Sequence, residues 1–182
     1  MTMPMSPDAV GALVIPYLGV SPTIHPEAWL APTAVLVGDV TVFATASIFY
    51  GVVVRADMAA VTIGEGTNLQ DNVVVHTDFD FPTVIGPGVS VGHAAVVHGC
   101  TIGADCLIGM NATVLNGAVI GEGSLVAAGS VVLEGTQIPQ RSLVAGIPGR
   151  VRRELSPEEC EKIKANARVY LDLAAGQGEP VG

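Results

Sequence analysis

Three of the four histidines in this chain have the residue type and spacing to bind a metal ion. His93 and His98 lie in the stretch VGHAAVVHGC, and His76 ends the strand-like stretch NVVVH. Three neutral imidazoles with a fourth position left to water form a catalytic zinc site, whereas structural zinc sites are closed by four protein ligands. Whether these side chains can meet depends on the elements that carry them.

A six-residue repeat indicates what those elements are. From Ile102 to Val144 an aliphatic residue recurs at every sixth position, with a small or compact side chain two positions before each one. Short strands joined by tight turns, three to a coil, give this pattern in a parallel β-helix. Upstream, the same period assigns the inward slot to Val37, Phe43, Phe49 and then Arg55.

The repeat and the segments around it define the predicted domain organisation. We predict an N-terminal extension over residues 1–16 and a parallel β-helix over residues 17–150. A C-terminal helix within residues 151–175 should pack on the coil, because Ser156, Pro157 and Glu159 form the start of a capping box and apolar residues follow at helical spacing. Residues 176–182 are expected to form a disordered tail.

The repeat also places the three histidines. His76 and His98 each directly follow an inward valine and lie three repeats apart once a corner loop is discounted. They should therefore share one face of neighbouring coils, about 4.8 Å apart, which is one inter-strand spacing. His93 belongs to the preceding face and points elsewhere on its own subunit. A site that uses all three requires a second chain, so we predict a homotrimer of coils with metal sites at its interfaces.

Polar residues gather upstream of His76. The stretch RADMAAVTIGEGTNLQD contains the only basic residue before position 140, Arg55, in a slot that the repeat otherwise fills with apolar residues. Such a residue in an acidic chain needs a partner, and we expect Arg55 to pair with Asp57 or Asp71. We assign Asp78 and Asp80, in the loop after His76, to solvent.

The remaining residues of reactive type receive structural readings. We expect His25 to be satisfied by backbone groups. The cysteines are expected to be reduced and packed, as in a cytoplasmic protein; they are Cys100, Cys106 and Cys160.

The motifs together resemble the γ-class carbonic anhydrases within the hexapeptide-repeat family. The resemblance rests on Arg-x-Asp at 55–57, Asn-x-Gln-Asp at 68–71, and the stretches NVVVHTD and VGHAAVVHGCTIG. It implies an all-β fold, namely a left-handed parallel β-helix with a C-terminal α-helix. It also implies a homotrimeric lyase that hydrates CO2 reversibly to bicarbonate.

The resemblance implies a metal centre with a defined set of ligands. His76 and His98 would hold Zn2+ together with His93 from a neighbouring subunit. Imidazole also suits Fe2+ and Co2+, so the identity of the metal stays open. Gln70 would orient the attacking hydroxide, and Asn68 would help to position CO2 or bicarbonate.

Further roles follow from the same resemblance. Arg55 with Asp71 would form an ion pair that braces the interface, and Asp57 and Tyr170 would line the pocket. The chain departs from the most active members of the family, which carry a glutamate directly after Arg-x-Asp and another on a longer acidic loop. Met58 and the short loop DFDFP stand at these places. We therefore expect low activity that is limited by proton export.

Composition excludes some classes of partner. The formal net charge is −9, and seven of the eight basic residues lie beyond position 140, so nucleic acid is not an expected partner. The apolar stretch AVGALVIPYLGV has no basic residue before it, is broken by Pro16 and is too short to span a bilayer. We predict a cytoplasmic protein without membrane attachment.

Two other functions fit the same sequence. A hexapeptide acyltransferase that uses coenzyme A is one, because LVAGIPGRVRREL resembles the end of such coils. A metal-binding assembly protein without turnover is the other.

Overall fold

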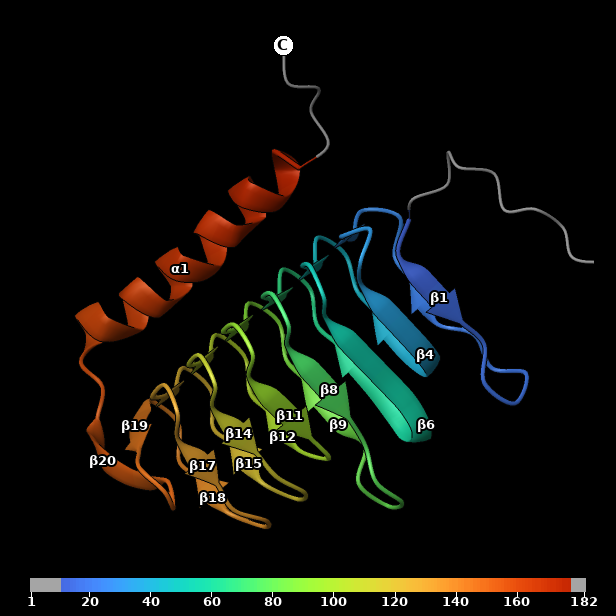
Figure 1. The fold of residues 1–182 in the computed structure, drawn as a ribbon. Helices are drawn as coiled ribbons and strands as arrows, with labels where there is room; N and C mark the ends of the chain where they lie inside the picture. Colours follow the sequence, from blue (N-terminus) through green and yellow to red (C-terminus); the bar gives the residue numbers. More distant parts are fainter. Residues whose placement is uncertain (1–10, 178–182) are drawn as a thin grey trace, which may run out of the picture.

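A computed structural model describes residues 11–177. The chain winds into a stack of short parallel strands, and one helix lies along the side of the stack (Figure 1). The predicted parallel β-helix with a C-terminal helix is confirmed. Among the described residues, no helix combines the length and the apolar character needed to cross a membrane.

The stack has three faces, because two long strands bend from one face into the next. We name the histidine face by the strands that carry His76 and His98 and their neighbours. These are β1 (Leu13–Ile15), β4 (Val35–Val42), β6 (Val53–Ile63), β8 (Val74–His76), β11 (Val96–His98), β14 (Thr113–Val114) and β17 (Val131–Val132).

The second face continues from the ends of β4 and β6. It consists of those ends with β2 (Thr23–Ile24), β9 (Thr83–Ile85), β12 (Thr101–Ile102), β15 (Val119–Ile120) and β18 (Gln137–Ile138).

The helix face is a separate sheet that the helix covers. It consists of β3 (Trp29–Leu30), β5 (Ser47–Ile48), β7 (Asn68–Leu69), β10 (Ser90–Val91), β13 (Leu107–Ile108), β16 (Leu125–Val126), β19 (Ser142–Ala145) and β20 (Arg150–Glu154).

In the regular part of the coil, from Ile102 to Val144, the interior is filled by one aliphatic side chain per strand and one small residue before it. Ile102, Ile108, Val114 and Ile120 are at most 1% exposed, as the repeat predicts. Cys100 and Cys106 fill the small inward slot and are free thiols, which confirms their expected packing. Burial raises the pKa of both thiols to about 12.

The upstream register predicted from the sequence is wrong by one residue. The inward side chains there are Leu36, Val42, Ile48 and Val54, all at most 2% exposed, while Phe43 is 47% exposed. Consecutive apolar residues in this part of the sequence let a six-residue period fit two registers, and a slip by one moves each side chain to the other side of the sheet. Arg55 therefore points outward and aligns with His76 rather than occupying an inward slot.

The domain bounds also differ at both ends of the coil. Residues 1–10 of the expected extension lie outside the described residues, but β1 already pairs in parallel with β4, so the coil begins before residue 17. At the other end β20 turns back antiparallel to β19 before the helix starts. This strand escaped prediction because its sequence, RVRRE, shows no apolar alternation.

The helix α1 (Pro157–Ala175) begins as the sequence predicts. The Ser156 side chain accepts a hydrogen bond from the Glu159 backbone N–H, and the Glu159 carboxylate accepts one from the Ser156 N–H. The buried face presents Ile163, Ala167 and Ala174 to the coil. Gly176 caps the helix, and residues 178–182 of the expected tail lie outside the described part of the chain.

Candidate metal centre

The histidine face carries the first group of functional side chains at one of its edges. His76 and His98 end β8 and β11 and are direct register partners, and Arg55 of β6 continues the same row. The two imidazole ring centroids lie 4.9 Å apart, close to the predicted inter-strand spacing. We call Arg55, Asp57, His76 and His98 the first half-site.

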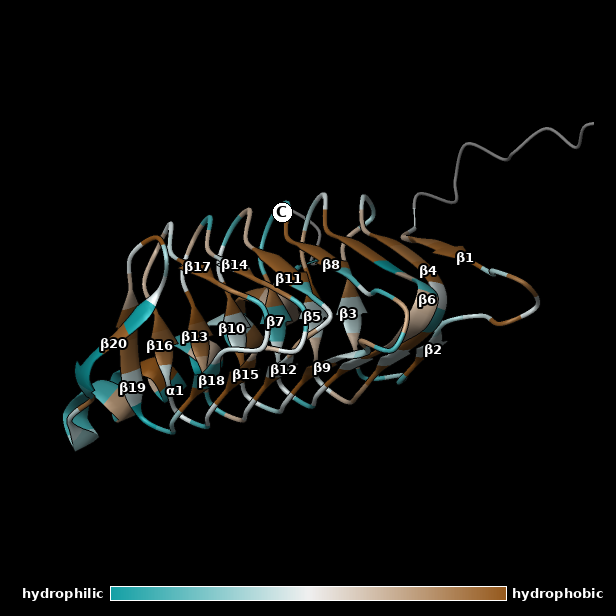
Figure 2. Cartoon of the chain, turned by 90° about the horizontal axis from the view of Figure 1, so that it is seen from below, coloured by the Kyte–Doolittle hydropathy of each residue, from teal (hydrophilic) through white to brown (hydrophobic). Residues whose placement is uncertain are grey.

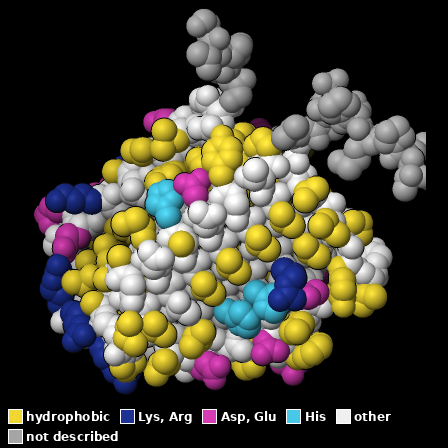
Figure 3. All heavy atoms as spheres, in the orientation of Figure 1, with side chains coloured by type: hydrophobic (Ala, Val, Ile, Leu, Met, Phe, Trp, Pro, Cys, Tyr) yellow, Lys and Arg dark blue, Asp and Glu magenta, His cyan; other side chains and the backbone are white. Residues whose placement is uncertain are grey.

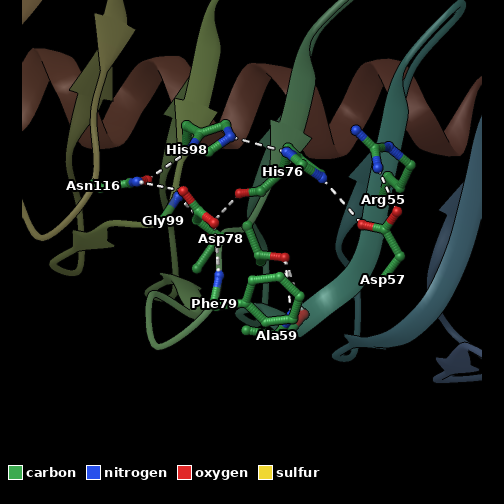
Figure 4. Close-up of polar contacts among 11 residues, drawn as sticks. Arg55, Asp57, Ala59, His76, Asp78, Phe79, His98, Gly99 and Asn116 are labelled. Carbon is green, nitrogen blue, oxygen red and sulfur yellow. Dashed lines mark hydrogen bonds and ion pairs between the residues drawn. The ribbon is translucent and has the colours of Figure 1, made fainter.

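The imidazoles of the first half-site converge on one point (Figure 4). His76 Nδ1 and His98 Nε2 are 2.9 Å apart, and His76 Nε2 lies 3.0 Å from Asp57 Oδ1. Asp57 also pairs with the Arg55 guanidinium, which meets the expectation that Arg55 pairs with one of two aspartates. Two ring nitrogens that meet in this way, each with a hydrogen-bonding group behind the ring, match the donor type that zinc sites use.

The charge of Asp57 is stabilised by its neighbours. Burial raises the pKa of this carboxyl, but hydrogen bonds from Arg55 and His76 outweigh burial and hold the pKa below its usual range. Asp57 is therefore an anion at neutral pH and favours a cation or a donated N–H at His76.

The second group lies at the opposite edge of the histidine face, at the corner where the chain passes from the helix face onto the histidine face. Asn68 and Gln70 are 1% and 4% exposed, and Gln70 Nε2 donates to Asn68 Oδ1 at 3.2 Å. His93 follows β10, and its Nδ1 lies 2.9 Å from Asp71 Oδ2. We call Asn68, Gln70, Asp71, His93 and Tyr170 the second half-site.

A groove between α1 and the helix face leads to the second half-site. Its volume is about 370 Å³, and Gln70, His93, Tyr170 and Asn166 line it together with apolar residues of β13 and β16. Tyr170 packs edge-on against Phe49 with ring centroids 5.5 Å apart. Burial, and to a lesser degree the Asp71 charge, raise the pKa of Tyr170, so its hydroxyl keeps its proton at neutral pH.

The two half-sites do not meet within one chain. Among residues 11–177, no three histidine, cysteine or acidic side chains are grouped closely enough to hold a metal ion. Figure 3 looks onto the histidine face and shows histidine side chains at two separated places, with hydrophobic side chains between them. Asp71 pairs with His93 and Arg55 pairs with Asp57, so the Arg55–Asp71 pair that the resemblance implies does not form within the chain.

Sequence reasoning missed one residue near the predicted metal ligands and misjudged another. Asn116 Oδ1 lies 2.6 Å from His98 Nδ1, and Asn116 Nδ2 donates to Asp78 Oδ2 at 3.2 Å. The solvated reading of Asp78 is therefore wrong, because its carboxylate is part of a side-chain network. Asn116 precedes Gly117, and Asn-Gly reads as an ordinary turn in the sequence.

The structure agrees with the expectations for His25 and Asp80. His25 Nδ1 accepts a hydrogen bond from the Glu27 N–H at 3.2 Å, so a backbone group does satisfy it. Asp80 is exposed. Met58 is 41% exposed and lines a small hollow beside Asp57. An apolar side chain therefore faces solvent at the position where the resemblance implies a glutamate in the most active family members.

Comparison with known proteins identifies the family. Residues 82–116 and 99–134 match the model of the bacterial transferase hexapeptide (six repeats). The chain is 57% identical over 145 residues to the probable carbonic anhydrase of Methanocaldococcus jannaschii, which covers 80% of this chain and 91% of that protein. It is 42% identical over 160 residues to the mitochondrial gamma carbonic anhydrase 2 of Arabidopsis thaliana, covering 85% of this chain and 58% of that one.

A solved structure shares the same coil. The putative acetyltransferase of Bacillus cereus superposes with a TM-score of 0.89 and 35% identity over 90% of this chain and 95% of that one. The fold is thus shared with a protein that is named as a putative acetyltransferase, at 35% identity. The relative with 57% identity is named as a probable carbonic anhydrase. The chain belongs to the γ-carbonic anhydrase-like branch of the hexapeptide-repeat proteins.

Proposed function

We propose that the protein is a metal-dependent carbonic anhydrase, assembled as a homotrimer with one active site at each subunit interface. The observation that carries this proposal is the division of the predicted site residues into two half-sites. One half-site holds two converging imidazoles, and the other holds one imidazole and the buried amides. The first half-site lacks a third imidazole and the amides, and the second half-site lacks the pair of converging imidazoles.

The position of the half-sites explains why a trimer would complete them. They flank opposite edges of the histidine face. If three chains turn this face toward a common threefold axis, the first edge of each chain meets the second edge of the next, and three identical sites form.

The histidine face has the surface that such an assembly needs. Its outward residues form a row of β-branched side chains in register along the stack, and the strands β4, β8, β11, β14 and β17 appear as an apolar band in Figure 2. Such a flat apolar row is typical of a surface that another protein covers. The members of the row are Val35, Val53, Val74, Val96, Thr113 and Val131.

The chemistry follows from the residues that would surround the ion. Bound Zn2+ would lower the pKa of water to about 7 and so supply hydroxide at neutral pH. His76, His98 and the neighbour's His93 would hold the metal, and Fe2+ or Co2+ would suit the same ligands. The negative charge of Asp57 would support His76 from behind the ring.

The amides of the second half-site have an orientation that suits this chemistry. Asn68 Nδ2 donates to Ser90 Oγ at 2.9 Å, and Gln70 Nε2 donates to Asn68 Oδ1. This chain of bonds leaves Gln70 Oε1 to accept the O–H of the attacking hydroxide and so to aim its lone pair at CO2. Asn68 and Tyr170 would shape the place where CO2 or bicarbonate lies.

Proton export would be the weak step. A carbonic anhydrase must release one proton for every CO2 hydrated, and an acceptor near the metal speeds this release. Met58 cannot accept a proton, so turnover would depend on buffer. The protein would be active but slow, and its free, buried Cys100 and Cys106 suit a reducing, cytoplasmic compartment.

Two other functions remain as competing hypotheses. The weak proton path favours a metal-binding assembly protein without turnover. The similarity to a putative acetyltransferase and the shared end of the coil favour an acyltransferase that uses coenzyme A. An acyltransferase of this type would need one histidine base and no metal, so metal content separates it from the other two.

One experiment tests the proposal. Protein purified without chelator is assayed for mass by sedimentation, for metal by elemental analysis and for CO2 hydration by stopped flow in increasing imidazole. We expect a trimer with about one divalent ion per chain and a rate that rises with imidazole. A metal-loaded trimer that shows no hydration above background at high imidazole would overturn the anhydrase proposal and leave a different substrate or a non-catalytic role.

A further inference from the structure

We propose that Asn116 and Asp78 are positioning residues that fix the tautomer of His98, so that its Nε2 lone pair faces the metal position. This inference rests on the proposed function for the identity of the site. It goes beyond that function in assigning a role to Asn116, which no quoted motif contains, and to Asp78, which ends the stretch NVVVHTD but has no role in the proposed function.

The first step is the orientation of the Asn116 amide. An amide nitrogen can only donate, and an aspartate carboxylate can only accept. Asn116 Nδ2 donates to Asp78 Oδ2 at 3.2 Å, so the amide oxygen must point the other way, toward His98 Nδ1 at 2.6 Å. An oxygen acceptor at this distance requires that Nδ1 carries the hydrogen.

The second step concerns the opposite side of the pair. His76 Nε2 faces the Asp57 carboxylate at 3.0 Å, so this nitrogen also carries its hydrogen. In the neutral imidazoles the two remaining nitrogens, His76 Nδ1 and His98 Nε2, then both present lone pairs. These two nitrogens are 2.9 Å apart, and in this pair of tautomers no hydrogen would lie between them.

Two facing lone pairs are unfavourable unless a cation lies between them. Asp57 and Asn116, acting from opposite sides, thus prepare both rings as ligands before any ion arrives. Metal-binding histidines commonly donate their second N–H to a carboxylate or carbonyl in this way. His76 uses a carboxylate directly, whereas His98 uses an amide that Asp78 orients.

The backbone makes room for this network. Gly99 directly follows His98, has φ +55° and lies against Asn116, where a Cβ would collide with Oδ1. The loop that carries Asp78 is closed by a bridge to Phe81, and Asp78 Oδ1 accepts the Phe79 N–H at 2.8 Å (Figure 4). Both ends of the Asp78–Asn116 contact are therefore held in place.

The inference predicts what happens when the acceptor is removed. In Asn116→Leu, His98 can move its hydrogen to Nε2 and donate it to His76 Nδ1. This bond would satisfy both rings and occupy the metal position. We expect Zn2+ and Co2+ to bind 10- to 100-fold more weakly, which is the usual cost of losing such a supporting group.

The experiment measures both the tautomer and the affinity. Imidazole 15N shifts of the metal-free protein report which nitrogen of His98 is protonated, and Co2+ titration followed by absorption reports affinity. Asn116→Asp should keep the Nδ1–H tautomer, because its carboxylate still accepts. Asp78→Ala should give mixed tautomers and an intermediate loss, and Glu134→Ala, one coil along the same corner and exposed, is the matched control.

Different results would overturn the positioning role of Asn116 and the proposed function. Wild-type tautomer and affinity in folded Asn116→Leu would overturn the positioning role and leave the anhydrase proposal intact. A wild-type trimer that binds no metal would overturn the proposed function, and the 15N shifts of the metal-free protein would still decide the tautomer. If Asn116→Leu does not fold, Asp78→Ala decides, because an Nδ1–H population equal to wild type in it would refute the role of Asp78.

Discussion

Replacing Val74 with aspartate should dissociate the proposed trimer and leave each coil folded. Val74 lies on the histidine face between its register partners Val53 and Val96, and its side chain points out of the coil. It is 39% exposed in the single chain, so the substitution has little effect on the interior. In the trimer the same position would be covered, and an aspartate would be buried near the threefold axis in three copies.

The magnitude follows from the cost of burying an unpaired charge. Effective penalties in proteins are several kcal/mol per ion, and each 1.4 kcal/mol weakens association tenfold. A penalty of about 3 kcal/mol per subunit therefore weakens association by more than about a hundredfold at each interface. Loss of the trimer should remove metal binding as well, because the two half-sites of a single chain do not meet.

The structure offers a close control in Val84→Asp. Val84 is also an outward valine in a short strand, and it is also 39% exposed, but it lies on the second face in β9. The proposed trimer leaves this face in solvent. Sedimentation velocity at micromolar concentration should find monomers for Val74→Asp and trimers for Val84→Asp. Trimers in both variants would refute the assignment of the histidine face as the interface.

Three further predictions concern rate, thiol reactivity and pH. Met58→Glu should raise CO2 hydration in weak buffer and reduce the stimulation by imidazole in stopped-flow assays; an unchanged buffer dependence would count against proton export as the slow step. In native protein at pH 8 a thiol reagent should react with Cys160 alone, because burial raises the pKa of Cys100 and Cys106 to about 12, and all three of the chain's thiols should react after unfolding. Hydrogen bonds from Arg153 and from the Ser156 N–H lower the pKa of Glu159 from 4.5 to about 2, so its contribution to stability is complete above about pH 4.5 and lost as the pH falls through about 2. The melting temperatures of wild type and Glu159→Gln should therefore differ above pH 5 and converge toward pH 2, and a difference that does not vary with pH would argue against the cap interaction.

The regular part of the repeat made much of the fold predictable. Between Ile102 and Val144 only one register satisfies both the aliphatic and the small positions, so the inward residues followed from spacing alone. The pairing of His76 with His98 followed in the same way, because both stand directly after an inward valine. The Ser156 cap was readable because its partners lie within one turn.

Three features of the structure were not predicted correctly from the sequence, and each has a physical reason. Near Val37 two apolar residues stand side by side, so the period fitted two registers and the wrong one placed Arg55 inward. The Asn116–Asp78 contact joins residues 38 positions apart across a corner, and no local pattern encodes such a pair. The strand β20 forms because the chain reverses onto the open edge of β19, and tertiary pairing overrode its polar sequence.

The most direct test of the central claim is complementation between two inactive variants in a mixed trimer. His93→Ala keeps the first half-site intact, and His76→Ala keeps His93. Homotrimers of either variant should bind no metal at full affinity, whereas each mixed trimer would contain one interface that joins both intact halves.

Random assembly of equal amounts makes about three quarters of the trimers mixed, so metal bound at wild-type affinity should recover to about a quarter of wild-type loading. Co-expression from one cell, followed by purification and elemental analysis, gives this number. Recovery to about a quarter would establish that the metal site is shared between chains. No recovery in mixed trimers whose composition is verified by mass spectrometry would contradict the account.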